Sequence, residues 1–195
     1  MIEVELKARL RDRAAAEAAV GSFAESVGAF DKRDGYWHGP DWRANRGMKG
    51  FRLRTEVGAD LAPENVVTFK SKRSEGGIEI NREVEFAVSD RSSFLEFILR
   101  LGCEPFYDKR KTGVAFKVAA SGSYPYAATV EMVEIEGLGD FIEIEILLES
   151  EEAGAVDLAR REILELLSLA GVAESEIEPR FYSELLMAAG LVARP

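Results

Sequence analysis

Apolar and charged residues alternate at the start of the chain, in the run Met1-Ile2-Glu3-Val4-Glu5-Leu6-Lys7-Ala8. Because successive side chains of a strand point to opposite faces, Glu3, Glu5 and Lys7 share one face and the apolar residues share the other. Like charges on one face repel, so the row makes physical sense mainly where a divalent cation bridges the acids and an anion meets the lysine. The alternative is an amphipathic edge strand with a solvated charged face.

The same pattern recurs along the chain as pairs of like charges two residues apart. These pairs are Arg52 and Arg54, Lys70 and Lys72, Glu83 and Glu85, Lys109 and Lys111, and Glu143 and Glu145. The wet face of an ordinary half-buried sheet mixes polar residues, whereas here each strand contributes one sign of charge. If these faces converge inside a closed barrel, the carboxylates are suited to Mg²⁺ or Mn²⁺ and the basic residues to a polyanion. The apolar faces would then point outward, under a cover of helices.

The periodicity predicts eight strands and four helices. The strands are expected over residues 2–8, 29–38, 49–56, 65–72, 78–88, 106–118, 127–135 and 140–148. The helices are expected over residues 12–27, 90–101 and 150–170 and after Pro179. Gly76-Gly77 and Gly137-Leu138-Gly139-Asp140 are typical of hairpin turns. The sequence thus predicts an α+β fold, an eight-stranded antiparallel β-barrel or tunnel with helices packed on the outside.

Composition narrows the function classes. The chain has 195 residues, 47% of them hydrophobic, which suits a single domain over residues 1–195 with a substantial core. The formal net charge of -10 argues against nucleic acid as a partner. One cysteine, Cys103, permits no internal disulfide, and one histidine, His38, permits no Cys/His metal cluster. No stretch reads as a signal peptide or membrane span, so we expect a soluble cytoplasmic protein without a membrane partner.

An ordered set of motifs carries a resemblance to a known family over nearly the whole chain. The motifs are Glu3-x-Glu5-x-Lys7, Phe51-Arg52-Leu53-Arg54, Phe69-Lys70-Ser71-Lys72, Arg82-Glu83-Val84-Glu85, Lys109-Arg110-Lys111 and Gly137-Leu138-Gly139-Asp140-Phe141-Ile142-Glu143-Ile144-Glu145. In this order they resemble the CYTH superfamily, also called triphosphate tunnel metalloenzymes. The resemblance implies an eight-stranded antiparallel tunnel that acts on triphosphates with a divalent metal, Mg²⁺ or Mn²⁺.

Two further segments are most similar to the class IV adenylyl cyclase branch, namely Asp34-Gly35-Tyr36-Trp37 and Phe181-Tyr182-Ser183-Glu184-Leu185-Leu186. That branch implies conversion of ATP to cyclic AMP and pyrophosphate, and a homodimer. The chain departs from the family at Val133, where relatives place an aspartate ahead of the Gly-Leu-Gly turn. Either Glu131, two residues earlier on the same face, takes over that function, or one metal or base function is weakened.

The resemblance also implies roles for the charged residues. Metal binding is expected at Glu3, Glu5, Glu143 and Glu145, with Glu83, Glu85 and Glu131 as further ligands or supporting groups. Phosphate binding is expected at Lys7, Arg52, Arg54, Lys70, Lys72, Lys109 and Lys111, because Arg offers bidentate contacts and Lys a point charge. Lys7, Arg54 and Lys72 are the expected catalytic groups, since charge develops on phosphoryl oxygens in the reaction. Arg82 and Arg110 have the opposite parity and are equally well explained as exterior ion-pair residues.

Three function classes stay open at this point. The first is a cyclase acting on ATP, and the second is a triphosphatase hydrolysing inorganic triphosphate, thiamine triphosphate or a nucleoside triphosphate. The third is a non-catalytic polyphosphate-binding module. His38 is either a contact to a base or a structural residue, and Tyr182 is expected to pack, with its hydroxyl hydrogen-bonded. Trp42 and residues 43–49 form either a lid over the tunnel mouth or a solvated loop.

Overall fold

A computed structural model describes residues 1–41, 50–58, 62–122 and 124–192. The strands are β1 (Ile2–Arg9), β2 (Glu25–His38), β3 (Phe51–Gly58), β4 (Glu64–Glu75), β5 (Ile78–Ala87), β6 (Glu104–Val118), β7 (Ala128–Ile135) and β8 (Gly139–Leu148). The helices are α1 (Arg13–Val20), α2 (Arg91–Arg100), α3 (Ala153–Leu169) and α4 (Tyr182–Ala188), with a 3₁₀ turn at Glu174–Glu176. Trp42 and residues 43–49, the expected lid or loop, lie outside the described residues.

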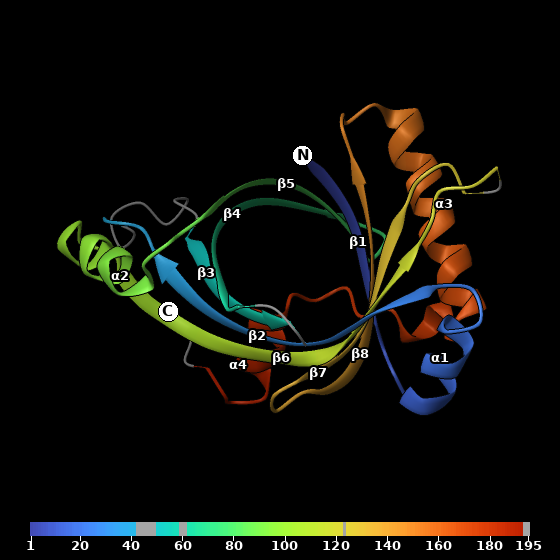
Figure 1. Cartoon of the computed structure of the whole chain (residues 1–195), viewed down its shortest axis with the longest axis horizontal. Coiled ribbons are helices and arrows are strands. Elements are labelled where there is room, and N and C mark those ends of the chain that lie inside the picture. Colours follow the sequence, from blue (N-terminus) through green and yellow to red (C-terminus); the bar gives the residue numbers. More distant parts are fainter. Residues whose placement is uncertain (42–49, 59–61, 123, 193–195) are drawn as a thin grey trace.

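The strands close into a barrel in the order β1-β5-β4-β3-β2-β6-β7-β8, and every neighbouring pair is antiparallel. Closure comes from β1, which pairs with β5 on one side and with β8 on the other (Figure 1). The tight turn between β4 and β5 uses Gly76 and Gly77, whose φ angles of 61° and 82° favour glycine. The predicted antiparallel barrel is therefore confirmed.

The first helix is shorter than its sequence predicts. We expected a helix over residues 12–27, but α1 ends at Val20 and β2 already begins at Glu25. The alanine-rich run ends at Ala19, residues from Glu25 onward pair with β6, and a bulge between Ser26 and Gly28 interrupts that pairing, with Gly28 at a φ of 121°. Tertiary strand pairing thus overrides a weak helix propensity.

The main hydrophobic core lies outside the barrel wall, between the strands and helices α1 and α3 (Figure 1). Val4 and Leu6 of β1 and Ile144 of β8 are fully buried there. They pack in one cluster with Ile163 and Leu166 of α3. The expected cover of helices is confirmed on this side.

The outer face of β4 and β5 is less well covered. Phe69, Val84 and Phe86 are 43%, 58% and 53% exposed. The helices therefore shield the barrel unevenly.

In the described residues, none of the helices combines the length and apolarity that crossing a membrane requires.

Two leucines of α3 test where the core lies. Leu166 is fully buried, whereas Leu158 on the same helix is 43% exposed. We expect Leu166→Ala to lower the free energy of unfolding by about 2–5 kcal/mol, because it leaves a cavity between helix and barrel. The control Leu158→Ala should change it by less than about 1 kcal/mol. Urea unfolding followed by circular dichroism measures both, and equal losses would contradict this arrangement.

Candidate functional site

The barrel encloses a cavity of about 1090 Å³ that receives side chains from all eight strands. Eight basic side chains line it: Lys7, Lys32, Arg52, Arg54, Lys70, Lys72, Lys109 and Lys111. Eight acidic side chains line it too: Glu3, Glu5, Glu79, Glu83, Glu85, Glu131, Glu143 and Glu145. Every residue that the sequence assigned to metal, phosphate or catalysis is in this set. The prediction that the charged strand faces converge in one cavity is therefore confirmed, while their chemical roles stay a proposal.

The two signs of charge occupy opposite walls of the cavity. The acids project from β7, β8, β1 and β5, which are consecutive in the barrel, and the bases project from β6, β2, β3 and β4, which complete it. Among these sixteen lining residues Lys7 is the exception, and two acids outside this set pair with the basic wall, Asp34 with Lys109 and Glu56 with Lys32. The site is thus a tunnel with an acidic wall facing a basic wall.

The sequence analysis gave no role to four buried residues of the site: Lys32 and Glu79 line the cavity, and Asp34 and Asn81 form hydrogen bonds with lining side chains. Lys32 and Asp34 stand two apart on β2 but carry opposite signs, so they do not form a like-charge doublet. Glu79 and Asn81 precede Glu83 in the same strand phase. The alternation that places Glu83 and Glu85 on one strand face, followed toward the start of β5, places Asn81 and Glu79 on the same face.

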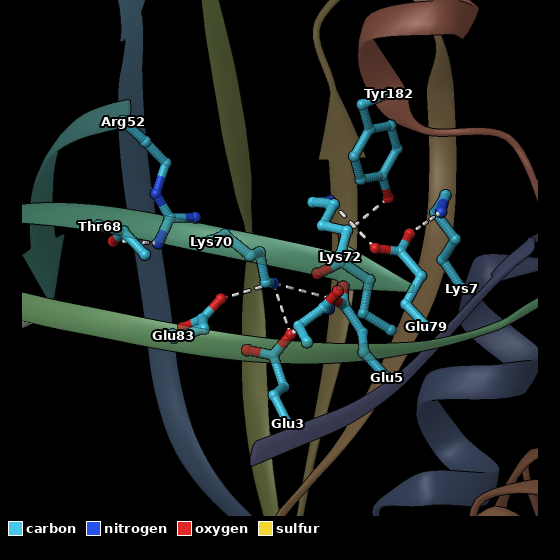
Figure 2. Close-up of polar contacts among 12 residues, drawn as sticks. Glu3, Glu5, Lys7, Arg52, Thr68, Lys70, Lys72, Glu79, Glu83 and Tyr182 are labelled. Atoms are coloured by element: carbon cyan, nitrogen blue, oxygen red, sulfur yellow. Dashed lines mark hydrogen bonds and ion pairs between the residues drawn. The ribbon is translucent and has the colours of Figure 1, made fainter. Parts of the chain in front are cut away.

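Lys70 lies at the centre of the acidic wall. Its ammonium is 2.5 Å from Glu3 Oε1, 3.3 Å from Glu5 Oε2 and 2.7 Å from Glu83 Oε1. Figure 2 shows the Lys70 side chain reaching from β4 to these carboxylates on β1 and β5. The Asn81 amide also donates to Glu3 Oε1, at 3.0 Å. Three acidic side chains therefore share one ammonium group.

Crowding of the acids perturbs their protonation. Burial and the charge of neighbouring Glu5 raise the pKa of Glu3 to about 9. For Glu5 burial also opposes ionisation, but the charges of Lys70, Lys72 and Lys7 and a hydrogen bond with Glu3 together outweigh burial and hold the pKa of that carboxyl well below its usual range. Burial and the Glu5 charge raise the pKa of Glu145 to about 7. These acids cannot all be ionised together at neutral pH without an additional cation.

Asp34 anchors the basic wall. Its carboxylate accepts two hydrogen bonds from the Arg54 guanidinium, at 2.6 and 3.0 Å, and lies 3.3 Å from Lys109 Nζ. Burial opposes its ionisation, but Arg54 and Lys109 outweigh burial and hold the pKa of Asp34 well below its usual range. One carboxylate thus orients the two cations of this wall.

A third group joins the walls near the start of β8. The Lys111 ammonium forms ion pairs with Glu143 and, at 2.7 Å, with Glu131. Glu131 also pairs with Lys32 at 2.5 Å, and despite burial these lysines lower the pKa of Glu131 to about 2. Val133 lies beside this group in a small apolar cluster with Phe141 and others. The expectation that Glu131 faces the cavity is confirmed, and Val133 packs against apolar residues.

The C-terminal segment reaches one end of the cavity. The Tyr182 hydroxyl donates to Glu143 Oε1 at 2.7 Å, which confirms the expected packing and hydrogen bond. The Phe181 ring lies 4.5 Å from Lys72 Nζ and 5.8 Å from Lys7 Nζ. These two lysines also share Glu79, at 3.0 and 2.7 Å (Figure 2). Aromatic faces and one carboxylate therefore hold the two ammonium groups together.

Arginines of opposite parity lie on opposite sides of the barrel wall. Arg52 points into the cavity, donates to Thr68 Oγ1 at 2.8 Å, and keeps its buried Nε without a hydrogen-bond partner among the described residues. Arg110 is exposed outside and pairs with Asp31 at 2.9 Å. Arg82 is also exposed. For Arg110 the exterior ion-pair alternative is therefore confirmed, and for Arg82 the exterior position is confirmed.

Aromatic side chains surround the cavity on β2 and β6. His38 lines the cavity with its ring 4.4 Å from that of Phe106, and Trp37 lines it as well. The rings of Tyr36 and Tyr107 are stacked 4.3 Å apart. These flat surfaces suit an aromatic group attached to a phosphate chain.

The residues on the acidic wall fit a divalent cation in their chemistry. Mg²⁺ and Mn²⁺ prefer carboxylate oxygens, and the charge of Glu5 contributes to the raised pKa of both Glu3 and Glu145, as expected for closely spaced acids. Within the described ranges, no three acidic, histidine or cysteine side chains already converge as a metal cage. Instead the carboxylates point to lysines, so a metal ion would have to exchange with an ammonium group.

Comparison with known proteins identifies the family. The model of the CYTH domain matches residues 1–182, so the chain belongs to the CYTH domain family. Members of this family bind triphosphates, use divalent metal ions and are generally enzymes. No protein among those of curated function matches this chain in sequence.

Solved structures share the fold. A protein of Pyrococcus horikoshii OT3 is similar with 27% identity and a TM-score of 0.73, covering 95% of this chain and 98% of that one. A proposed adenylate cyclase of Vibrio parahaemolyticus has 20% identity and a TM-score of 0.75, covering 96% and 98%. A proposed adenylyl cyclase of Hippeastrum, described as having a dominant triphosphatase activity, has 15% identity and a TM-score of 0.61, covering 96% of each chain.

Asp34→Asn tests the anchor of the basic wall. Because Arg54 and Lys109 would be left buried without a counter-charge, we expect the free energy of unfolding at pH 7 to fall by about 3 kcal/mol or more. The folded pKa of Asp34 is lowered, so its stabilisation is present above the ordinary aspartate pKa and is lost as the pH falls through the lowered value. The control Asp31→Asn, on the outer face of β2, should cost less than about 1 kcal/mol. Urea unfolding at pH 7 measures both variants, and an Asp34→Asn protein as stable as wild type would contradict the anchoring role.

Proposed function

We propose that this protein is a metal-dependent enzyme that acts on a triphosphate inside its tunnel, and specifically an adenylyl cyclase that converts ATP to cyclic AMP and pyrophosphate. The observation that carries the proposal is the separation of charge into an acidic and a basic wall around one cavity. A phosphate chain needs cations along its length, and a metal ion needs carboxylates opposite that chain. The tunnel offers both at once.

The basic wall would bind and orient the phosphate chain. Arg52 and Arg54 offer planar pairs of N–H donors, and among the described residues the Arg52 Nε has no acceptor, so it can take a phosphate oxygen. Lys109 and Lys111 add point charges from β6, and Lys7 and Lys72 converge through Glu79 at the end that Phe181 covers. We assign phosphate binding to these residues and to Lys70. Lys7, Arg54 and Lys72 would stabilise the charge that develops on phosphoryl oxygens during transfer.

The acidic wall would hold Mg²⁺ or Mn²⁺ through Glu3, Glu5, Glu143 and Glu145, with Glu83, Glu85 and Glu131 as further ligands or supporting groups. When bound, the ion would neutralise phosphate charge and lower the pKa of the attacking oxygen. In a cyclase that oxygen is the ribose 3′-oxygen, which must reach the α-phosphorus in line with the departing pyrophosphate. Catalysis is then mostly positioning and electrostatic stabilisation.

The aromatic side chains favour a nucleotide over inorganic triphosphate. Trp37, His38 and Phe106 line the same cavity as the arginines, and such rings stack on a base. Triphosphatase activity is the second candidate, because Val133, packed in an apolar cluster, stands where the resemblance to the CYTH superfamily implies an aspartate. The shared fold is compatible with either reaction.

A product assay separates the candidates. Purified protein is incubated with ATP, tripolyphosphate or thiamine triphosphate, each with Mg²⁺ or Mn²⁺. We expect cyclic AMP and pyrophosphate from ATP, and loss of turnover in excess EDTA. Orthophosphate release without cyclic AMP would favour the triphosphatase, and binding without any product would reject enzymatic function. Equal turnover in the chelator would contradict the metal role.

Arg52→Gln tests the basic wall directly. Losing charge-assisted hydrogen bonds to phosphate should weaken tripolyphosphate binding about tenfold to a hundredfold. The control Arg110→Gln removes an arginine from the outer face of β6 and should change the affinity less than about twofold. Isothermal titration calorimetry gives both dissociation constants. Equal effects of the two substitutions would argue against phosphate binding inside the barrel.

A further inference from the structure

Lys70 holds an unusual position for a member of the basic wall. Its backbone lies in β4, next to β3 and its arginines, but its ammonium lies within 3.3 Å of carboxylates on β1 and β5 (Figure 2). Lys72, two residues along the same strand face, has one such partner, Glu79. Lys70 therefore occupies the part of the acidic wall where several carboxylates converge.

We propose that Lys70 is a resident counter-ion that competes with the divalent metal and couples metal binding to triphosphate binding. In the structure its ammonium contacts the carboxylate oxygens of Glu3, Glu5 and Glu83. When a metal ion enters, Lys70 turns away and becomes available to a phosphate oxygen. This inference rests on the proposed function, since it concerns the same tunnel.

Charge explains why the two cations exclude each other. A divalent ion coordinated by Glu3 and Glu5 would need the oxygens that Lys70 contacts at 2.5 and 3.3 Å. At such distances, among buried side chains shielded from bulk water, repulsion between an ammonium and a divalent ion strongly disfavours binding of both at once. Three carboxylates around one ammonium also retain an excess of negative charge, which a divalent ion compensates better.

The geometry of β4 gives the displaced ammonium a destination. Thr68, the preceding residue on the same face of β4, is the register partner of Arg52 and accepts its hydrogen bond at 2.8 Å. The long lysine side chain is flexible, so its charged end can move toward Arg52 while the strand stays in place. Each metal ion bound would thereby add one cation to the basic wall. Binding of metal and of phosphate would then be mutually favourable, by the same factor in both directions.

Mn²⁺ titrations of purified wild-type, Lys70→Met and Lys72→Met proteins, followed by the EPR signal of free Mn²⁺, test the proposal without any turnover. Without phosphate, we expect Lys70→Met to bind Mn²⁺ about tenfold more tightly than wild type, because the competing charge is gone. Lys72→Met, whose lysine pairs with Glu79 alone among the described carboxylates, should change the affinity less than about threefold. Lys70→Gln carries the same expectation as Lys70→Met and replaces it if circular dichroism finds the Met variant unfolded.

The outcomes separate this inference from the proposed function. Unchanged or weaker Mn²⁺ binding by the Lys70 variants, with wild type still binding Mn²⁺ and tripolyphosphate, would overturn the counter-ion role and leave the proposed function standing. An equal gain of Mn²⁺ affinity in Lys72→Met would also overturn it, because the effect would then not be specific to the position of Lys70. If wild type and variants all fail to bind Mn²⁺, the metal-dependent function and this inference fall together.

Discussion

Closure of the barrel by the pairing of β1 with β5 and β8 is the constraint on which the rest of the structure depends. It turns the charged faces of eight strands toward the inside of the barrel. Burying an ionised group there without a partner costs several kcal/mol. The acids and bases must therefore meet across the cavity. The order of the strands places consecutive acidic strands opposite consecutive basic strands, so that partners lie within reach.

The ion pairs that stabilise the cavity are also what a ligand must replace. A triphosphate brings negative charge to the basic wall, and a metal ion brings positive charge to the acidic wall. When the ion pairs between the walls break, the triphosphate would replace the carboxylates as partners of the basic wall, and the metal ion would replace the ammonium groups as partners of the acidic wall. Binding of either component alone would leave one wall uncompensated. In the proposed function, this exchange would let a cavity lined by as many acids as bases accept a highly charged substrate.

The outer surface of the barrel also has two different sides, one packed under helices and one partly exposed. Outward-facing residues of β1, β7 and β8 join the core beneath α1 and α3, so the acidic wall is backed by the most densely packed part of the molecule. The outer face of β4 and β5 retains exposed Phe69, Val84 and Phe86. At one end of the barrel, Val133 packs with Phe141 and Leu185, where α4 brings Tyr182 to Glu143. An apolar residue at position 133 thus serves the contact with the C-terminal helix.

The sequence by itself determined which side chains share a strand face, because the alternation of a strand is local and has a period of two residues. Together with the resemblance to the CYTH superfamily, that alternation predicted the barrel and the convergence of Glu3, Arg54, Lys70 and Glu145 in one cavity. The tertiary structure decided which strands are neighbours, and with that the pairing of Lys70 with Glu3 and of Arg54 with Asp34. It also decided that residues 25–27 join β2. These outcomes depend on contacts between residues far apart in the chain, and the local period carries no information about such contacts.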